Sequence, residues 1–151
     1  YPRGNGQGVT WRDEPWEMIP VGKGQLLHDG EKIAVLSIGA IGNKAAQAVS
    51  RAEGDGIRAL HYDMRFIKPI DKDLLAEVCK KASTIITVED GALYGGLHSA
   101  VAEYIAEHGL DNKLIGMGIP DRFVEQGTVA ELQHECSYDA DAIYDTIIKN
   151  H

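Results

Sequence analysis

The stretch Lys32–Asp63 reads KIAVLSIGAIGNKAAQAVSRAEGDGIRALHYD, and it predicts a strand, a helix and a second strand. Lys32–Ile38 is strongly apolar, as a strand buried on both faces would be. Asn43 can cap a helix that ends near Gly54. The predicted apolar face of this helix consists of Ala45, Ala46, Val49 and Ala52. Arg58–Asp63 is the second strand, so the stretch indicates parallel strands joined by a right-handed helical crossover.

Strands and helices continue to alternate after this unit. Residues 84–88 and 113–119 are apolar and of strand length. Asp71 begins a helix that follows the first unit and precedes residues 84–88. Thr128 and Glu131 have the spacing of a capping box for a short helix. The apolar faces predicted for the other helices are Leu74, Leu75, Val78 and Ala82; Leu97, Ala100, Val101, Tyr104 and Ile105; and Ala140, Ile143, Tyr144, Ile147 and Ile148.

The segment before Lys32 predicts one antiparallel strand. Residues 21–27 are strand-like, and His28-Asp29-Gly30 carries the Asp-Gly turn signal, so we expect a hairpin with residues 32–38. The sheet should therefore be mixed. The sequence predicts an α/β domain over residues 21–151, built of three layers in the order α/β/α, with a mixed, mostly parallel sheet of about five strands. Residues 1–20 are rich in glycine and proline, without periodicity, and are expected to be a linker.

Charge and composition narrow the classes of function. The formal net charge of −8 disfavours binding to a phosphate backbone, so we expect no nucleic-acid partner. No apolar run approaches the roughly 20 residues of a membrane span, so we expect a soluble protein with no membrane partner. The two cysteines, Cys79 and Cys136, lack the spacing of a metal site, and no metal ligand set is predicted.

The turn Gly39-Ala40-Ile41-Gly42-Asn43 is a candidate anion site. It joins a strand to a helix N-terminus, where free N–H groups and the helix dipole attract negative charge. Asp63 follows Gly42 by 21 residues, the place of a ribose-binding acid. The complete dinucleotide fingerprint is absent, however, because Ser37 stands where a glycine is needed. A tight structural turn is favoured, and a regulatory nucleotide- or phosphate-binding module remains the alternative.

Glu89 and Asp90 form a second candidate site with Gly95-Gly96 and His98. The two carboxylates end a strand beside a glycine pair, which resembles the lip of a ligand site. His98 lies one turn into the following helix and could face the same lip. The glycines could equally serve only to admit a close backbone. His98 and His61 have no paired nucleophile or carboxylate in the sequence, which favours structural roles, and no catalytic residue is assigned.

The segment Asp63–Asp71, DMRFIKPID, is the third candidate. Pro69 keeps Lys68 out of helical geometry and makes this a rigid corner. Arg65 and Lys68 could meet a phosphate, but pairing with Asp63 and Asp71 is favoured.

Several of these segments together resemble one family, the 1-deoxy-D-xylulose 5-phosphate synthases. The sequences of that family are similar to this chain in five segments: Tyr1–Asn5 (YPRGN), Asp63–Asp71, Thr87–Asp90 with Gly95-Gly96, Gly118–Phe123 and Gln126–Thr128. These segments span nearly the whole chain. They match the family's carboxy-terminal domain, preceded by the end of its pyrimidine-binding domain in residues 1–20. Asp90 departs from the pattern, since the family often has a glutamate there, and His98 lies at a variable position.

The resemblance implies the function of a larger enzyme. That enzyme condenses pyruvate with glyceraldehyde 3-phosphate to 1-deoxy-D-xylulose 5-phosphate, the first step of the non-mevalonate isoprenoid pathway, and it also feeds thiamine synthesis. It uses thiamine diphosphate and Mg2+, which bind its amino-terminal domains, so no cofactor is expected in this chain and the chain alone is expected to be inactive. The implied partners are those domains and a second subunit in a homodimer, in the bacterial cytoplasm.

Arg3 matches the arginine that binds the substrate phosphate in that family, which suits the paired donors of a guanidinium. The alternative within the wider superfamily is a transketolase or 2-oxo acid dehydrogenase β-type carboxy-terminal domain that acts in docking.

Overall fold

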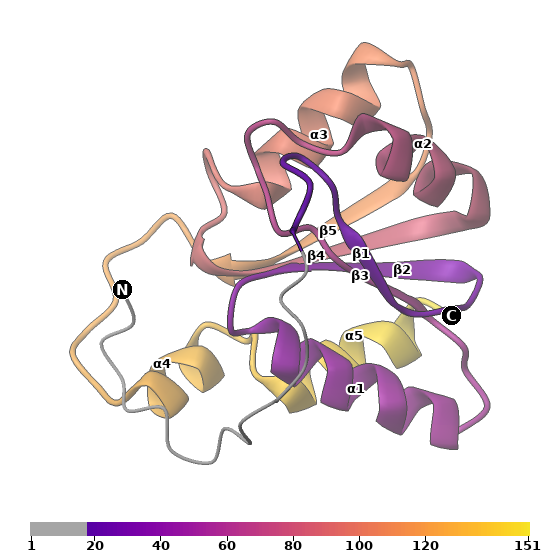
Figure 1. The fold of residues 1–151 in the computed structure, drawn as a ribbon. Coiled ribbons are helices and arrows are strands. Elements are labelled where there is room, and N and C mark those ends of the chain that lie inside the picture. Colours follow the sequence, from indigo (N-terminus) through magenta and orange to yellow (C-terminus); the bar gives the residue numbers. More distant parts are fainter. Residues whose placement is uncertain (1–17) are drawn as a thin grey trace.

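The computed structural model describes residues 18–151, which form one five-stranded sheet with helices on both faces (Figure 1). The strands are β1 (Gln25–His28), β2 (Lys32–Ile38), β3 (Leu60–Asp63), β4 (Ala82–Ala92) and β5 (Lys113–Ile119), in the order β1-β3-β2-β4-β5. The helices are α1 (Gly42–Gly54), α2 (Lys72–Lys81), α3 (Leu97–Glu107), α4 (Val129–Glu135) and α5 (Ala140–Lys149). β1 is antiparallel to β3 and the other pairs are parallel, which confirms the three-layer fold with a mixed, mostly parallel sheet.

The predicted hairpin is wrong in its pairing. β1 lies at the sheet edge beside β3, because β2 is buried on both faces and takes β3 and β4 as its two neighbours. The connection from β1 to β2 crosses the start of β3, where the Glu31 N–H donates to the Arg58 carbonyl at 3.1 Å. A Cβ on Gly30 would lie 2.3 Å from that same carbonyl oxygen. The Asp-Gly dipeptide therefore serves a close crossing and not a two-residue hairpin turn.

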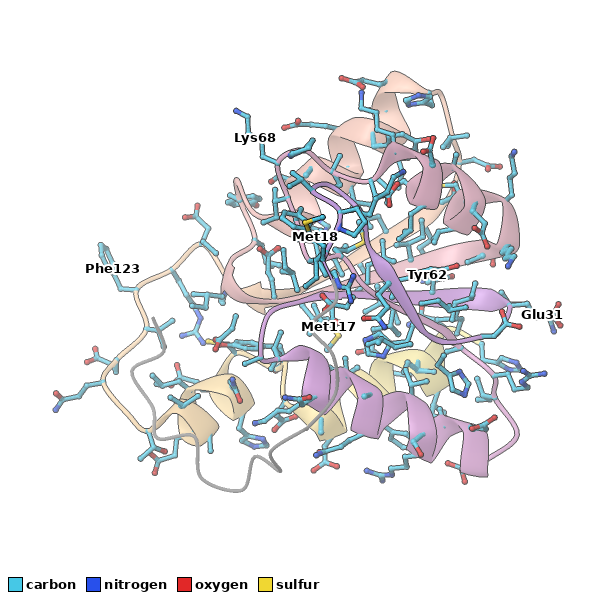
Figure 2. All side chains as sticks on the ribbon, in the orientation of Figure 1. Met18, Glu31, Tyr62, Lys68, Met117 and Phe123 are labelled. Atoms are coloured by element: carbon cyan, nitrogen blue, oxygen red, sulfur yellow. The ribbon has the colours of Figure 1, made fainter. Side chains whose placement is uncertain are left out.

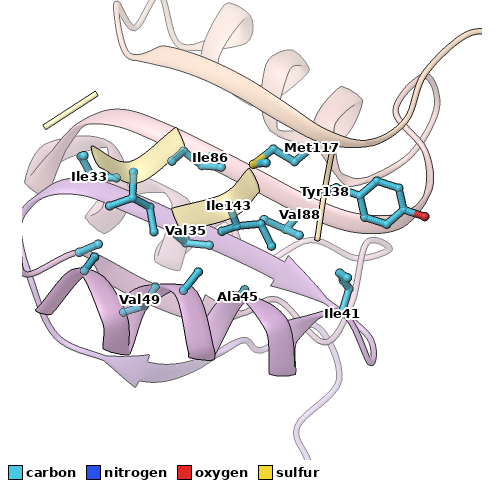
Figure 3. Packing of buried hydrophobic residues seen from close by; sticks show 14 residues of the cluster. Ile33, Val35, Ile41, Ala45, Val49, Ile86, Val88, Met117, Tyr138 and Ile143 are labelled. Carbon is cyan, nitrogen blue, oxygen red and sulfur yellow. The ribbon is translucent and has the colours of Figure 1, made fainter. Parts of the chain in front are cut away.

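The core is divided by the sheet into two apolar layers. One layer packs α1 and α5 against β2 and β4, with Val35, Val49, Ile86 and Ile143 among its buried members (Figure 3). The other packs α2 and α3 against the opposite face, around Leu36, Leu75, Ile85 and Val101. Side chains alternate between the layers along each strand, as the pleat requires. Figure 1 shows α2 and α3 on one side of the sheet and α1 and α5 on the other.

The start of α1 differs from the prediction. α1 begins at Gly42, and Ile41 occupies the N-cap position without a side-chain hydrogen bond, so Asn43 does not cap it. The turn carbonyls of residues 39–41 already accept the first helical N–H groups, which leaves no donor for an Asn43 cap. The predicted inner face is confirmed at Ala45, Val49 and Ala52, but Ala46 is exposed and Ala48 is buried in its place.

Asp71 and the Thr128–Glu131 capping box fulfil their predicted roles. The Asp71 carboxylate accepts from the Leu74 N–H at 3.1 Å and caps α2. It also accepts from the Gly24 N–H and from the Lys23 ammonium, each at 3.1 Å, so it ties the first described loop to α2. Burial alone would raise the pKa of Asp71, but the hydrogen bonds from Leu74, Lys23 and Gly24 together hold it below its usual value. Asp71 thus connects the edge strand to the second core layer.

His61 is a buried imidazole on β3, only 1% exposed. Its Nε2 shares a hydrogen bond of 2.8 Å with the Ser37 hydroxyl on β2. Burial lowers the pKa of His61 to about 4, and the nearby Asp63 carboxylate only partly offsets this. His61 is therefore neutral in the folded protein at neutral pH, and it fills the space between two parallel strands below the α1 turn.

We expect Asp71→Ala to lower the free energy of unfolding by about 1–3 kcal/mol, because a buried cap with three donors is removed. Urea unfolding followed by circular dichroism measures the change. Asp73→Ala is the matched control, since the Asp73 side chain is 90% exposed and pairs with the same Lys23. Equal effects of the two substitutions would contradict the role assigned to the Asp71 cap.

We expect the His61 imidazole to make folding weaken in acid. Its folded pKa lies below the unfolded value, so the unfolded chain binds the extra proton between pH 6.5 and pH 4, and stability is lost as the pH falls through that window. The contribution is about 2–3 kcal/mol between pH 7.5 and pH 4.5. His61→Gln should reduce the loss measured by urea unfolding at the two pH values. His151→Gln, at the exposed chain end, should leave it unchanged.

Candidate functional site

The carboxyl ends of β2, β4 and β5 meet at one edge of the sheet, where α/β proteins commonly bind ligands. Glu89 and Asp90 lie at this edge, inside β4, which extends to Ala92 and is longer than the sequence predicts. Because neighbouring strand residues face opposite sides, Glu89 points toward α3 and Asp90 toward α4 and α5. The two carboxylates therefore do not form one acid–base pair.

The Glu89 carboxylate caps helix α3. Its side chain is buried, and its two oxygens accept from the Leu97 N–H at 2.9 Å and the His98 N–H at 2.8 Å. A negative charge at a helix N-terminus is stabilised by the unpaired N–H groups and the dipole there. A Cβ on Gly96 would lie 1.9 Å from the carboxylate, so this position requires glycine. Glu89 and the glycine pair thus form a structural cap.

His98 packs against the sheet. Its Nδ1 shares a hydrogen bond of 3.2 Å with the Thr87 hydroxyl on β4. A Cβ on Gly116 would lie 2.7 Å from the same nitrogen, so β5 approaches the ring closely. His98 is therefore brought beside Glu89 through the backbone of α3, while its ring nitrogen is occupied by Thr87.

Asp90 faces the other side of the sheet and is exposed. It accepts a hydrogen bond of 2.8 Å from the hydroxyl of Tyr138, a residue that is itself 2% exposed. Burial, followed by the hydrogen bond to Asp90, raises the pKa of Tyr138. Tyr138 therefore stays protonated as a donor and holds Asp90 at the rim of the edge.

Two cavities meet at Asp90. One, of about 190 Å³, lies between the segment after β5 and α4, and its walls include Ile119, Val124, Leu132 and Cys136. The other, of about 350 Å³, lies between the α1 turn and α4. Both are mostly apolar, which is typical of surfaces that receive side chains or small ligands. Sequence reasoning missed this feature, since Tyr138 lies 48 residues from Asp90 and belongs to none of the motifs.

The Gly39–Asn43 turn uses its own donors. The N–H groups of Gly42, Asn43 and Lys44 donate to the carbonyls of Gly39, Ala40 and Ile41, at 3.0, 3.2 and 2.9 Å. The Lys44 ammonium contacts the Gln133 side chain. Asp63, the candidate ribose-binding acid, accepts from the Arg65 N–H at 3.0 Å. The arrangement favours the tight structural turn over the anion site.

The Asp63–Asp71 corner is held differently from the predicted ion pairs. Asp71 pairs with Lys23, at 3.1 Å, because the loop before β1 lies over the start of α2. The Arg65 guanidinium contacts Gln25 of the edge strand, and Lys68 is exposed at the end of the corner (Figure 2). The corner therefore anchors β1, and its cations do not converge on a common ligand.

No group suited to a metal–diphosphate clamp occurs among residues 18–151, where three or more His, Cys, Asp or Glu side chains do not gather as a metal site. Over the same residues no helix is both long enough and apolar enough to cross a bilayer. Arg3, the predicted phosphate-binding residue, lies outside the residues that the structure describes.

Comparison with known proteins shows which family this chain resembles. The model of the family described as "Transketolase, C-terminal domain" matches residues 22–143. The chain is 49% identical over 151 residues to a protein from Bacteroides fragilis and 50% identical over 150 residues to one from Bacteroides thetaiotaomicron, both named 1-deoxy-D-xylulose-5-phosphate synthase. Each alignment covers 99% of this chain and 23% of the relative, so the chain spans about a quarter of the length of these relatives.

Two solved structures share the fold. A split-gene transketolase, in an inactive β4 tetramer, has a TM-score of 0.81 and 29% identity over 95% of this chain and 46% of that chain. A transketolase mutant from Pichia stipitis has a TM-score of 0.62 and 18% identity over 85% of this chain and 18% of its own, which shows the fold alone. The family match over residues 22–143 and the agreement in fold lead to one conclusion: the chain belongs to the transketolase C-terminal domain family.

Proposed function

We propose that this chain is the carboxy-terminal domain of a thiamine-diphosphate-dependent 1-deoxy-D-xylulose-5-phosphate synthase. The observation that carries the proposal is the identity of about half of all residues, across 99% of the chain, to proteins of that name. The complete enzyme condenses pyruvate with glyceraldehyde 3-phosphate and releases carbon dioxide, in the cytoplasm of a bacterium. In this proposal residues 21–151 are the domain, and residues 1–20 are the linker and the end of the preceding domain.

The described residues support an architectural role within that enzyme. The Glu89 carboxylate is hydrogen-bonded to the first N–H groups of α3, and Asp90 is hydrogen-bonded to Tyr138. The N–H groups at the start of α1 donate to carbonyls of the preceding turn. The described side chains also do not fit a diphosphate-bound Mg2+, since they form no cluster of metal ligands. We therefore assign thiamine diphosphate and Mg2+ to the amino-terminal domains, and to this domain the completion of the subunit and its homodimer.

Arg3 is the residue of this chain that we assign to substrate. In the sequence Pro2 precedes it and Gly4 follows it; a proline restricts the backbone, and a glycine has no side chain that would exclude a ligand. A guanidinium presents paired donors that match two phosphate oxygens. Arg3 would bind the phosphate of glyceraldehyde 3-phosphate and leave pyruvate to other residues.

Residues 1–151 alone should bind no thiamine diphosphate and turn over no pyruvate, because residues 18–151 form no group of metal ligands and the proposal places the cofactor in the other domains. Isothermal titration with thiamine diphosphate and Mg2+ should give no saturable heat, while the full-length enzyme, as the control, should bind. Saturable binding at micromolar cofactor would contradict the assignment of the cofactor to the other domains.

In the full-length enzyme, Arg3→Ala should reduce kcat/KM for glyceraldehyde 3-phosphate by roughly ten- to a hundred-fold, the loss of about 1.5–3 kcal/mol of charge-assisted hydrogen bonding. Pyruvate binding should stay nearly unchanged. Arg12→Ala, in the same segment, is the matched control and should alter neither parameter. An equal loss for both substrates, or none for either, would make Arg3 a structural residue.

A further inference from the structure

The surface beside the candidate site carries two large aromatic side chains that are exposed. Phe123 is fully exposed, with 105% relative accessibility, and Tyr94 is 72% exposed. Both line a groove of about 470 Å³, and Ala92, Ile119 and Pro120 also line it. Figure 2 shows Phe123 standing clear of the ribbon. Isolated exposed apolar residues are common in proteins, but an aromatic pair around an apolar groove is typical of an interface.

The loop that carries Phe123 is held in place without Phe123. Arg122 pairs with Glu135 of α4 at 3.1 Å, and the Arg122 N–H donates to the Pro120 carbonyl at 2.8 Å. At the other end of the loop the Thr128–Glu131 capping box fixes the start of α4. An aromatic side chain on a restrained loop loses little conformational freedom when it is buried, so Phe123 is preorganised as an anchor.

We infer that the preceding domain of the same polypeptide docks on the Tyr94–Phe123 groove, with Phe123 inserted into an apolar pocket of that domain. This rests on the proposed function, in which the chain is the last quarter of a longer enzyme. About three-quarters of each relative's length lies outside the matched region, so the domain would be covalently tethered to a large neighbour. A short tether raises the effective concentration of such a neighbour to roughly the millimolar range, at which even a small apolar contact is formed.

Charge disfavours a second copy of this chain as the occupant of the groove. The chain carries a net charge of −8, which disfavours association with a second acidic copy through a small contact. The groove itself is bordered by both signs, Asp121 and Arg122, and so offers a polar rim around an apolar centre.

A thiol reporter tests the docking in the full-length enzyme. Asp121→Cys places a thiol at the groove and keeps Phe123, while Asp111→Cys places a thiol at an exposed position before the other end of β5. Maleimide labelling is read by peptide-resolved mass spectrometry, which separates these thiols from Cys79 and Cys136. We expect position 121 to react at least tenfold more slowly than position 111, at every protein concentration. Adding Phe123→Ser should return position 121 to the rate of position 111.

The other outcomes overturn the inference. Equal labelling of positions 121 and 111 in the full-length enzyme would show that nothing covers the groove. Protection that increases with protein concentration would assign the groove to a second copy, and protection that survives Phe123→Ser would remove Phe123 as the anchor. Synthase activity of the same unlabelled preparation tests the proposed function separately, since an active enzyme with an unprotected position 121 fails only the docking inference.

Discussion

The fold depends on the burial of β2 on both of its faces. Its interior residues alternate between the two core layers, with Ile33 and Val35 toward α1 and α5, and Ala34 and Leu36 toward α2 and α3. A strand of this kind cannot lie at an edge, because one row of backbone groups and both rows of side chains would face water. β3 and β4 must therefore flank it, and helices must cover both sides. This one requirement explains the position of β1 at the edge and the three layers.

The same requirement forces polar side chains in the sheet to find partners inside the protein. Ser37 and His61 face each other across β2 and β3, and Thr87 meets His98 across the start of α3. Every buried side-chain nitrogen and oxygen among the described residues has a hydrogen-bond partner. Unpaired polar atoms in such an environment would each cost about 1–3 kcal/mol. The histidines that attract attention in the sequence are thus part of the packing of a parallel sheet.

Much of the fold could be predicted from local patterns, and the errors in long-range pairing have a common cause. Helix caps depend on local sequence, and the caps predicted at Asp71 and at Thr128 with Glu131 are confirmed, whereas the cap predicted at Asn43 is wrong. The partner of β1 was not, because Asp-Gly indicates a turn but does not reveal that β3 is inserted between β1 and β2. The ion pairs predicted for the Asp63–Asp71 corner are wrong for the same reason, since the cation that pairs with Asp71 is Lys23, 48 residues away. Long-range neighbours depend on tertiary packing, which a window of sequence does not contain.

The candidate site shows the same division between residue type and placement. The sequence predicts Glu89 and Asp90 at the end of a strand and His98 in the next helix, yet only the fold shows that the pleat separates the two carboxylates. At the carboxyl edge, each of these groups is held by a contact within the domain, Glu89 by the α3 N–H groups and Asp90 by Tyr138. These hydrogen bonds hold the two polar groups in place beside the mostly apolar cavities at the carboxyl ends of the strands.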